Sequence, residues 1–184
     1  MDNGTDSYRR FLGGDDSGFV EIVRDYKDGL ILYLNSFVRN ITAAEELAED
    51  TFVKLGVKKP RFSEKSSFKT WLYAIGRNVA VDYMRKATKY VYIPIDEYDG
   101  VSDMKTLENA YIREETKITV HRTMGRLKAE YRQVLWLIYF ERFSCREAGA
   151  VMKKSEHNIA TLIYRAKKAL KSELEKEGFD YEIL

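Results

Sequence analysis

Apolar residues recur at helical spacing through most of this chain, and this periodicity constrains the fold more than any other feature. From Phe19 to Val38 they follow the spacing i, i+3, i+4, i+7 of one helix face. Only two prolines, Pro60 and Pro94, occur in the 184 residues. Alternation typical of a strand is missing except, at most, over Val91–Ile95. We therefore predict an all-α fold.

Capping signals divide the chain into further helices. Thr42-Ala-Ala-Glu45 fits a capping box that opens a helix ending near Leu55. A helix from about Ser67 to Lys89 is expected after a loop, and the strongly apolar segment Tyr131–Phe140 predicts a core helix. We expect two small helical domains, 8–89 and 117–178, joined by an acidic linker at 90–116.

The C-terminal part has the pattern of a helix-turn-helix. Ser144-Cys-Arg-Glu147 fits a capping box for a short helix, Lys153–Ser155 a turn, and Glu156–Glu177 a long second helix. Ala148 and Gly149 allow the two helices to cross closely. The residues expected to meet base edges are Glu156, His157, Asn158, Ala160 and Thr161, and those expected at phosphates are Arg165, Lys167, Lys168 and Lys171. The alternative is a helical hairpin that binds no DNA.

The net charge of +2 hides a strong segregation of charge. Residues 53–89 hold 10 basic and 2 acidic side chains, and residues 116–172 hold 13 basic and 4 acidic ones. Residues 1–52, 90–115 and 173–184 are each acidic. Two basic blocks indicate two surfaces for a polyanion, although solvated helix faces would give the same pattern.

Aromatic side chains alternate with cations in the first basic block. Phe62, Phe68, Trp71 and Tyr83 lie among Lys65, Lys69, Arg77, Arg85 and Lys86. Such a mixture suits single-stranded DNA, because unstacked bases need aromatic faces and the backbone needs positive charge. On a helix, Phe68, Leu72, Val79 and Tyr83 form a core stripe, and Trp71, Ile75, Asn78, Asp82 and Arg85 form an adjacent one. The alternative is that Trp71 is simply a core residue.

Two long segments carry a resemblance to a known family. Ala44–Leu55 followed by Phe62–Arg85 resembles region 2 of bacterial RNA polymerase sigma factors, and Tyr131–Ser144 with the helix-turn-helix resembles region 4. The chain is most similar to the extracytoplasmic-function (ECF) group, which keeps these two regions. The resemblance implies a subunit that binds core polymerase and directs promoter recognition, DNA melting and transcription initiation.

The resemblance also implies roles for particular residues. The helix at 46–55 matches the contact with the β′ coiled coil, through Glu46, Glu49, Asp50 and Phe52; alternatively, Phe52 is a core residue and the acids are solvated. Region 4 would contact the β flap. The non-template strand of the melted −10 element would be bound by Phe62, Lys65, Lys69, Trp71, Arg77, Asn78, Arg85 and Lys86. Alternatively, Asn78 and Asp82 could form a hydrogen bond with each other. The −35 duplex would be read from Glu156 to Arg165. Ala160 and Leu162 stand where relatives commonly have Lys and Arg, so these −35 contacts depart from the family pattern.

The remaining expectations concern partners and chemistry. An anti-sigma factor is implied by the resemblance. No nucleotide-binding glycine loop, metal-ligand cluster or catalytic constellation is recognisable, so we expect neither a cofactor nor enzymatic activity. A single cysteine, no signal peptide and no apolar run of membrane length favour a cytoplasmic protein without membrane insertion. Two alternatives stay open: a stand-alone helix-turn-helix regulator, and an enzyme acting on nucleic acid.

Overall fold

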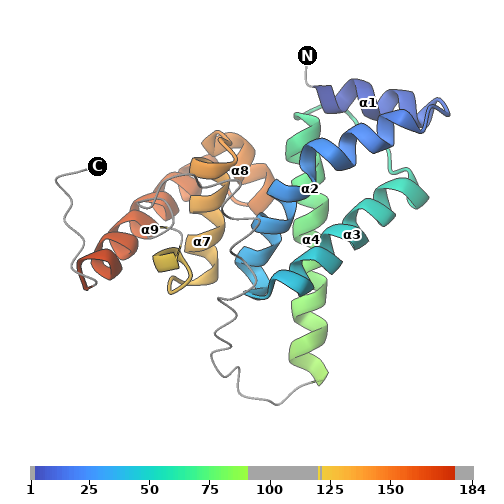
Figure 1. Ribbon diagram of the computed structural model, residues 1–184. Coiled ribbons are helices and arrows are strands. Elements are labelled where there is room, and N and C mark those ends of the chain that lie inside the picture. The colour runs from blue at the N-terminus through green and yellow to red at the C-terminus, as the bar shows by residue number, and fades with distance from the viewer. Residues whose placement is uncertain (1–2, 91–119, 121, 177–184) are drawn as a thin grey trace.

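The computed structural model describes residues 3–90, 120 and 122–176, and the part of the chain that it describes is helical with no strand. Figure 1 shows two groups of helices side by side. The first group comprises α1 (Asn3–Leu12), α2 (Ser17–Val38), α3 (Ile41–Lys58) and α4 (Phe68–Tyr90), and the second comprises α7 (Ala129–Leu135), the π-helix η1 (Trp136–Phe140), α8 (Cys145–Met152) and α9 (Glu156–Lys176). The all-α prediction is confirmed. The expected linker at 90–116 falls almost wholly outside the described residues.

Helix α2 is the centre of the first group. It packs against α1, α3 and α4, and Leu30–Leu34 are almost fully buried. Residue Arg39 adopts a left-handed conformation that ends α2, and Asn40 caps α3 by accepting a hydrogen bond from the backbone N–H of Ala43 at 3.0 Å. The predicted capping box at Thr42 is therefore wrong, because the asparagine two residues earlier already satisfies the first turn.

Helix α1 was not expected from the sequence, although its pattern contains the signal. The side chains of Ser7, Tyr8 and Phe11 are buried on one face with Gly4, at the spacing i, i+3, i+4, i+7. Gly4 and Gly18 allow this helix to lie close to its neighbours, since a Cβ on Gly18 would stand 2.2 Å from the carbonyl oxygen of Ser7. Helix α1 thus completes the first group.

The second group contains the predicted core helix in an altered form. After Leu135 the segment widens into one turn of π-helix, and Trp136 stacks on Phe140 with ring centroids 4.3 Å apart. Two short-range caps define the helices that follow. Ser144 and Glu147 form the predicted capping box, and the hydroxyl of Ser155 accepts from the backbone N–H of Asn158 at 3.2 Å.

The two groups share a single continuous hydrophobic core. Helix α8 packs against α4, and α7 packs against α2, so residues distant in sequence meet between the groups (Figure 1). Within the described ranges no helix is long and apolar enough to cross a membrane.

Candidate nucleic-acid interface

An aromatic platform lies where the loop after α3 meets the start of α4. The ring of Phe62 lies edge-on to Phe68, with centroids 5.8 Å apart, and 5.0 Å from the ring of Trp71. Phe68 is buried, whereas Phe62 and Trp71 are half-buried. A platform with a buried base and two partly accessible rings can accept an unstacked base on its outer face. Trp71 therefore serves both the core and the surface.

Helix α1 holds this loop in place. The hydroxyl of Tyr8 donates to the carbonyl oxygen of Pro60 at 2.6 Å, and the Tyr8 ring lies 5.3 Å from Trp71. Arg9 forms an ion pair with Glu64 at 2.6 Å, and Glu64 has a left-handed backbone with φ of 55°. Burial raises the pKa of Tyr8 to about 12, so its hydroxyl stays a donor. The sequence did not indicate Tyr8 as a residue that positions the loop.

The candidate −10 residues divide between two faces of α4. Trp71, Asn78 and Arg85 lie on one stripe, as expected, and Arg85 is exposed with an ion pair to Asp82 at 3.2 Å. Phe68, Leu72 and Val79 are buried as predicted, whereas Tyr83 is 42% exposed and does not belong to the core. Lys65 in the loop and Lys86 on α4 are exposed.

Lys69 is engaged inside the protein, and Arg77 is half-buried. The ammonium group of Lys69 forms an ion pair with the buried carboxylate of Glu141 at 2.8 Å and lies 5.2 Å from the ring centroid of Phe143. The Nε atom of Arg77 is buried. Burial raises the pKa of the core residue Tyr33, and the positive charge of Arg77 opposes this rise. In this conformation the Lys69 charge is engaged by the second group of helices, not presented to DNA.

The helix-turn-helix presents one polar surface. Glu156, His157 and Asn158 at the start of α9 are exposed, as are Arg165, Lys167 and Lys168, while Thr161 is half-buried and donates to the carbonyl oxygen of His157 at 3.1 Å. A Cβ on Gly149 would stand 2.7 Å from the carbonyl oxygen of Lys154, so the glycine lets α8 lie close against the turn, and Ile159 of α9 would be 3.7 Å away.

Two further positions on α9 affect the proposed −35 contacts. Leu162 is 8% exposed and belongs to the core, so a DNA contact at that position is not available in this chain. Tyr164 is 70% exposed on the same side as His157 and Lys168, and the sequence did not single it out. Its spacing of i+3 from Thr161 could have placed it on the exposed face. Nearby, the ammonium group of Lys167 lies 5.5 Å from the ring centroid of Tyr139.

A third surface lies on the outer face of α3. Glu46, Glu49 and Asp50 are exposed, but Phe52 is 6% exposed and belongs to the core, so it cannot make the contact that we expected. Helical geometry explains the difference, because position 52 turns toward α2 while position 53 continues the acidic stripe. Val53 and Val57 are 59% and 78% exposed and extend this stripe with apolar side chains.

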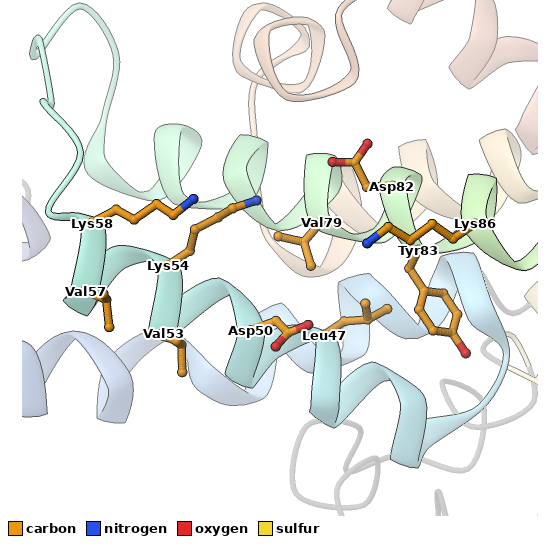
Figure 2. A pocket seen from close by; sticks show the side chains of 10 residues that line it. All are labelled: Leu47, Asp50, Val53, Lys54, Val57, Lys58, Val79, Asp82, Tyr83 and Lys86. Atoms are coloured by element: carbon orange, nitrogen blue, oxygen red, sulfur yellow. The ribbon is translucent and has the colours of Figure 1, made fainter.

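A groove of about 340 Å³ lies between α3 and α4, and Asp82, Tyr83 and Lys86 line it on the α4 side. Figure 2 shows Lys54 and Lys58 reaching from α3 toward α4, with Lys86 reaching into the same space from α4. Asp50 lines the groove on the α3 side. The groove therefore holds charges of both signs from both helices. Among the described residues no three His, Cys, Asp or Glu side chains gather as a metal site.

Comparison with known proteins agrees with this arrangement. The family description "Sigma-70 region 2" matches residues 22–90, and "Sigma-70, region 4" matches residues 117–170. The chain is similar to the ECF RNA polymerase sigma factor SigW of Bacillus subtilis, with 28% identity over 88% of this chain and 91% of the relative. It is also similar to SigM of the same organism, with 29% identity over 83% and 92% of the two chains.

Two solved structures share the fold. The structure of CnrH in complex with the cytosolic domain of CnrY has a TM-score of 0.68 and 22% identity, and covers 95% of this chain and 99% of its own. The sigma factor RpoE in complex with the anti-sigma factor NepR from Bartonella quintana has a TM-score of 0.63 and 23% identity, with coverages of 85% and 96%. At these identities the likeness establishes the fold alone.

Proposed function

Because this chain belongs to the sigma-70 family of RNA polymerase sigma factors, in its ECF group, we propose specific roles for its three surfaces. As a sigma factor it binds RNA polymerase and serves promoter-directed transcription initiation. The acidic face of α3 would bind the polymerase β′ coiled coil, the platform and stripe of α4 would bind the melted −10 strand, and α9 would read the −35 duplex.

The observation that carries this proposal is the platform of Phe62, Phe68 and Trp71 beside exposed cations. Three rings within 6 Å of one another, with the outer two partly accessible, offer an extruded base a stacking surface. Base stacking on aromatic rings contributes about 1–3 kcal/mol per base, which offsets the few kcal/mol of unstacking. Separation of the strands would thus need binding energy and no catalytic group, in agreement with a family that is not enzymatic in general.

The polymerase contact is proposed to combine charge with apolar area. Glu46, Glu49 and Asp50 would give electrostatic complementarity to a basic partner, and Val53 and Val57 would bury apolar surface beside them. Phe52 is left out because its side chain is already buried in the protein's own core.

We further propose that the chain works as two domains, 8–89 and 117–178, in the cytoplasm, with an anti-sigma factor as its inhibitor. CnrH and RpoE have each been captured with a protein partner, CnrY and NepR respectively. A partner of this chain would need to cover the α3 face or the α4 stripe in order to exclude polymerase or DNA. The linker at 90–116, the β flap contact and the absence of enzymatic activity are part of the same proposal.

The test combines association with core polymerase and run-off transcription. We expect the purified chain to associate with core enzyme and to produce transcripts that depend on the promoter. The variant Glu49→Lys should weaken the association, and Arg24→Glu, an exposed change on α2 away from the three surfaces, should not. A chain that binds promoter duplex but neither associates with core enzyme nor supports transcripts would contradict the proposal and favour a stand-alone regulator.

A further inference from the structure

The loop that carries the aromatic platform depends on other segments for its shape. It joins α3 to α4, and among the described residues the backbone of residues 61–66 forms no hydrogen bond with another backbone group. Glu64 in this loop has a left-handed backbone with φ of 55°, which a residue other than glycine keeps only where its surroundings hold it. The conformation of the loop is therefore set by side-chain contacts.

Helix α1 supplies the side chains that make these contacts. The hydroxyl of Tyr8 donates to the carbonyl oxygen of Pro60, at the start of the loop. The guanidinium group of Arg9 donates to both carboxylate oxygens of Glu64, at 3.1 and 2.6 Å. Two consecutive residues of α1 thus hold the start and the middle of the loop.

The same helix also packs against the rings of the platform. The side chain of Tyr8 is buried, and its ring centroid lies 5.3 Å from that of Trp71 and 5.5 Å from that of Phe68. A Cβ on Gly4 would overlap the ring of Phe68, so this glycine allows α1 to approach closely. Helix α1 nevertheless lies before residue 22, where the match to the region 2 description begins.

We propose that α1 is part of the unit that reads the −10 strand, with Tyr8 and Arg9 as positioning residues that fix the loop in the conformation that admits the preferred base. This proposal rests on the proposed function of the platform. A loop that is already ordered binds without a further cost of ordering, and a fixed shape excludes bases that do not fit it. Without the two contacts the loop adopts other conformations and accepts other bases, so selectivity for the −10 sequence falls.

The first experiment measures opening of the loop in the free chain. Tyr8→Phe keeps the ring contacts and removes only the hydroxyl donor. Trypsin cleaves after Arg61 and Lys65, both exposed, and the rate of cleavage at these sites, followed by mass spectrometry, reports how often the loop opens. Loss of one hydrogen bond should raise this rate about fivefold. The control Tyr33→Phe removes a buried hydroxyl that has no hydrogen-bond partner among the described residues, and should leave the rate unchanged.

The second experiment measures selectivity with the chain bound to core polymerase. The probe is a promoter fragment whose −10 non-template strand is single-stranded and randomised, and the bound pool is sequenced. Discrimination between the most and the least favoured base at the most selective position should fall about fivefold in Tyr8→Phe and stay unchanged in Tyr33→Phe. Arg9→Glu should also lower it, and adding Glu64→Arg should restore it, because the exchanged pair keeps its opposite charges.

Association with core polymerase, measured in parallel, should be the same for all these variants. Unchanged selectivity in Tyr8→Phe and Arg9→Glu with normal association would overturn the proposal. An equal loss of selectivity and association would also overturn it, because it would assign α1 to the fold alone. A parent chain that does not associate with core enzyme would instead contradict the proposed function, and in that case unchanged cleavage rates in Tyr8→Phe would still overturn the role of α1.

Discussion

Arg132 allows the coupling between the two groups of helices to be tested through stability. The residue is 9% exposed, and its guanidinium group donates to the carbonyl oxygens of Ser36, Leu127 and Gly125. Burial, with the nearby charge of Arg39, lowers the pKa of Arg132 to about 10, so the group is still protonated at neutral pH. The side chain thus ties the end of α2 to the loop that precedes α7.

The substitution Arg132→Met keeps the aliphatic stem and leaves three carbonyl oxygens without this donor. Each buried acceptor that loses its partner costs about 1–3 kcal/mol, and removing the desolvated charge recovers part of that cost. We therefore expect the free energy of unfolding to fall by about 3 kcal/mol. The free energy of unfolding of Arg132→Lys should lie between those of the parent and the methionine variant, because an ammonium group cannot reproduce the planar set of donors of a guanidinium group.

Urea denaturation followed by circular dichroism measures this change, and Arg146→Met, at an exposed position on α8, is the control. Since two of the hydrogen bonds cross between the groups of helices, the methionine variant should also unfold in two steps, one for each group. A decrease in the free energy of unfolding below about 1 kcal/mol, with a single unfolding transition, would refute the reasoning. It would mean that the three carbonyl oxygens find other hydrogen-bond partners at no cost.

Four further predictions address the surfaces and the cap. Trp71→Ala combined with Asn78→Ala should impair open-complex formation in permanganate footprinting more than it impairs binding to core polymerase; equal losses would assign both residues to structure alone. Arg165→Ala should weaken −35 duplex binding in fluorescence anisotropy and reduce the salt slope by about 1, and an unchanged slope would exclude a phosphate contact. The free chain, which is nearly neutral at +2, should bind −10 and −35 DNA weakly at physiological salt, and moderate affinity in the same assay would contradict this. Burial alone would raise the pKa of Glu147, but hydrogen bonds from Ser144, Ser67 and Thr70 lower it below 4.5, so its stabilisation is present above that pH and is lost on acidification. The stability difference between the parent and Glu147→Gln should accordingly shrink between about pH 7 and pH 3.5 in urea denaturation, and a constant difference would argue against a charged cap.

The helices could be predicted because their signals are local. Ser144 and Glu147 form a cap within one turn of helix, and the apolar stripe Phe19–Val38 faces a core at every turn. Errors arose where two local signals competed, as at Asn40 and Thr42, both of which are capable caps. The widening of the Tyr131–Phe140 helix into a π-turn could not be predicted, since it depends on the stacking of Trp136 over Phe140.

The candidate sites depended instead on contacts between distant segments. Phe52 can be interpreted as a contact or as a core residue until its helix is packed, and it is buried. Lys69 has the charge and position of a phosphate contact, but its partner, Glu141, lies 72 residues away in sequence. Nothing in the local pattern around either residue indicates this pairing, because an ion pair between segments requires only complementary charge and a shared location.

The contact between the two groups of helices changes the local charge at the start of α4. The +8 of residues 53–89 is reduced locally when Glu141 and Glu147 face the start of α4, so the second block supplies acids to the first. Lys69 is therefore engaged inside the protein, and the exposed cations of this block that we propose for phosphate contacts are Lys65, Arg85 and Lys86.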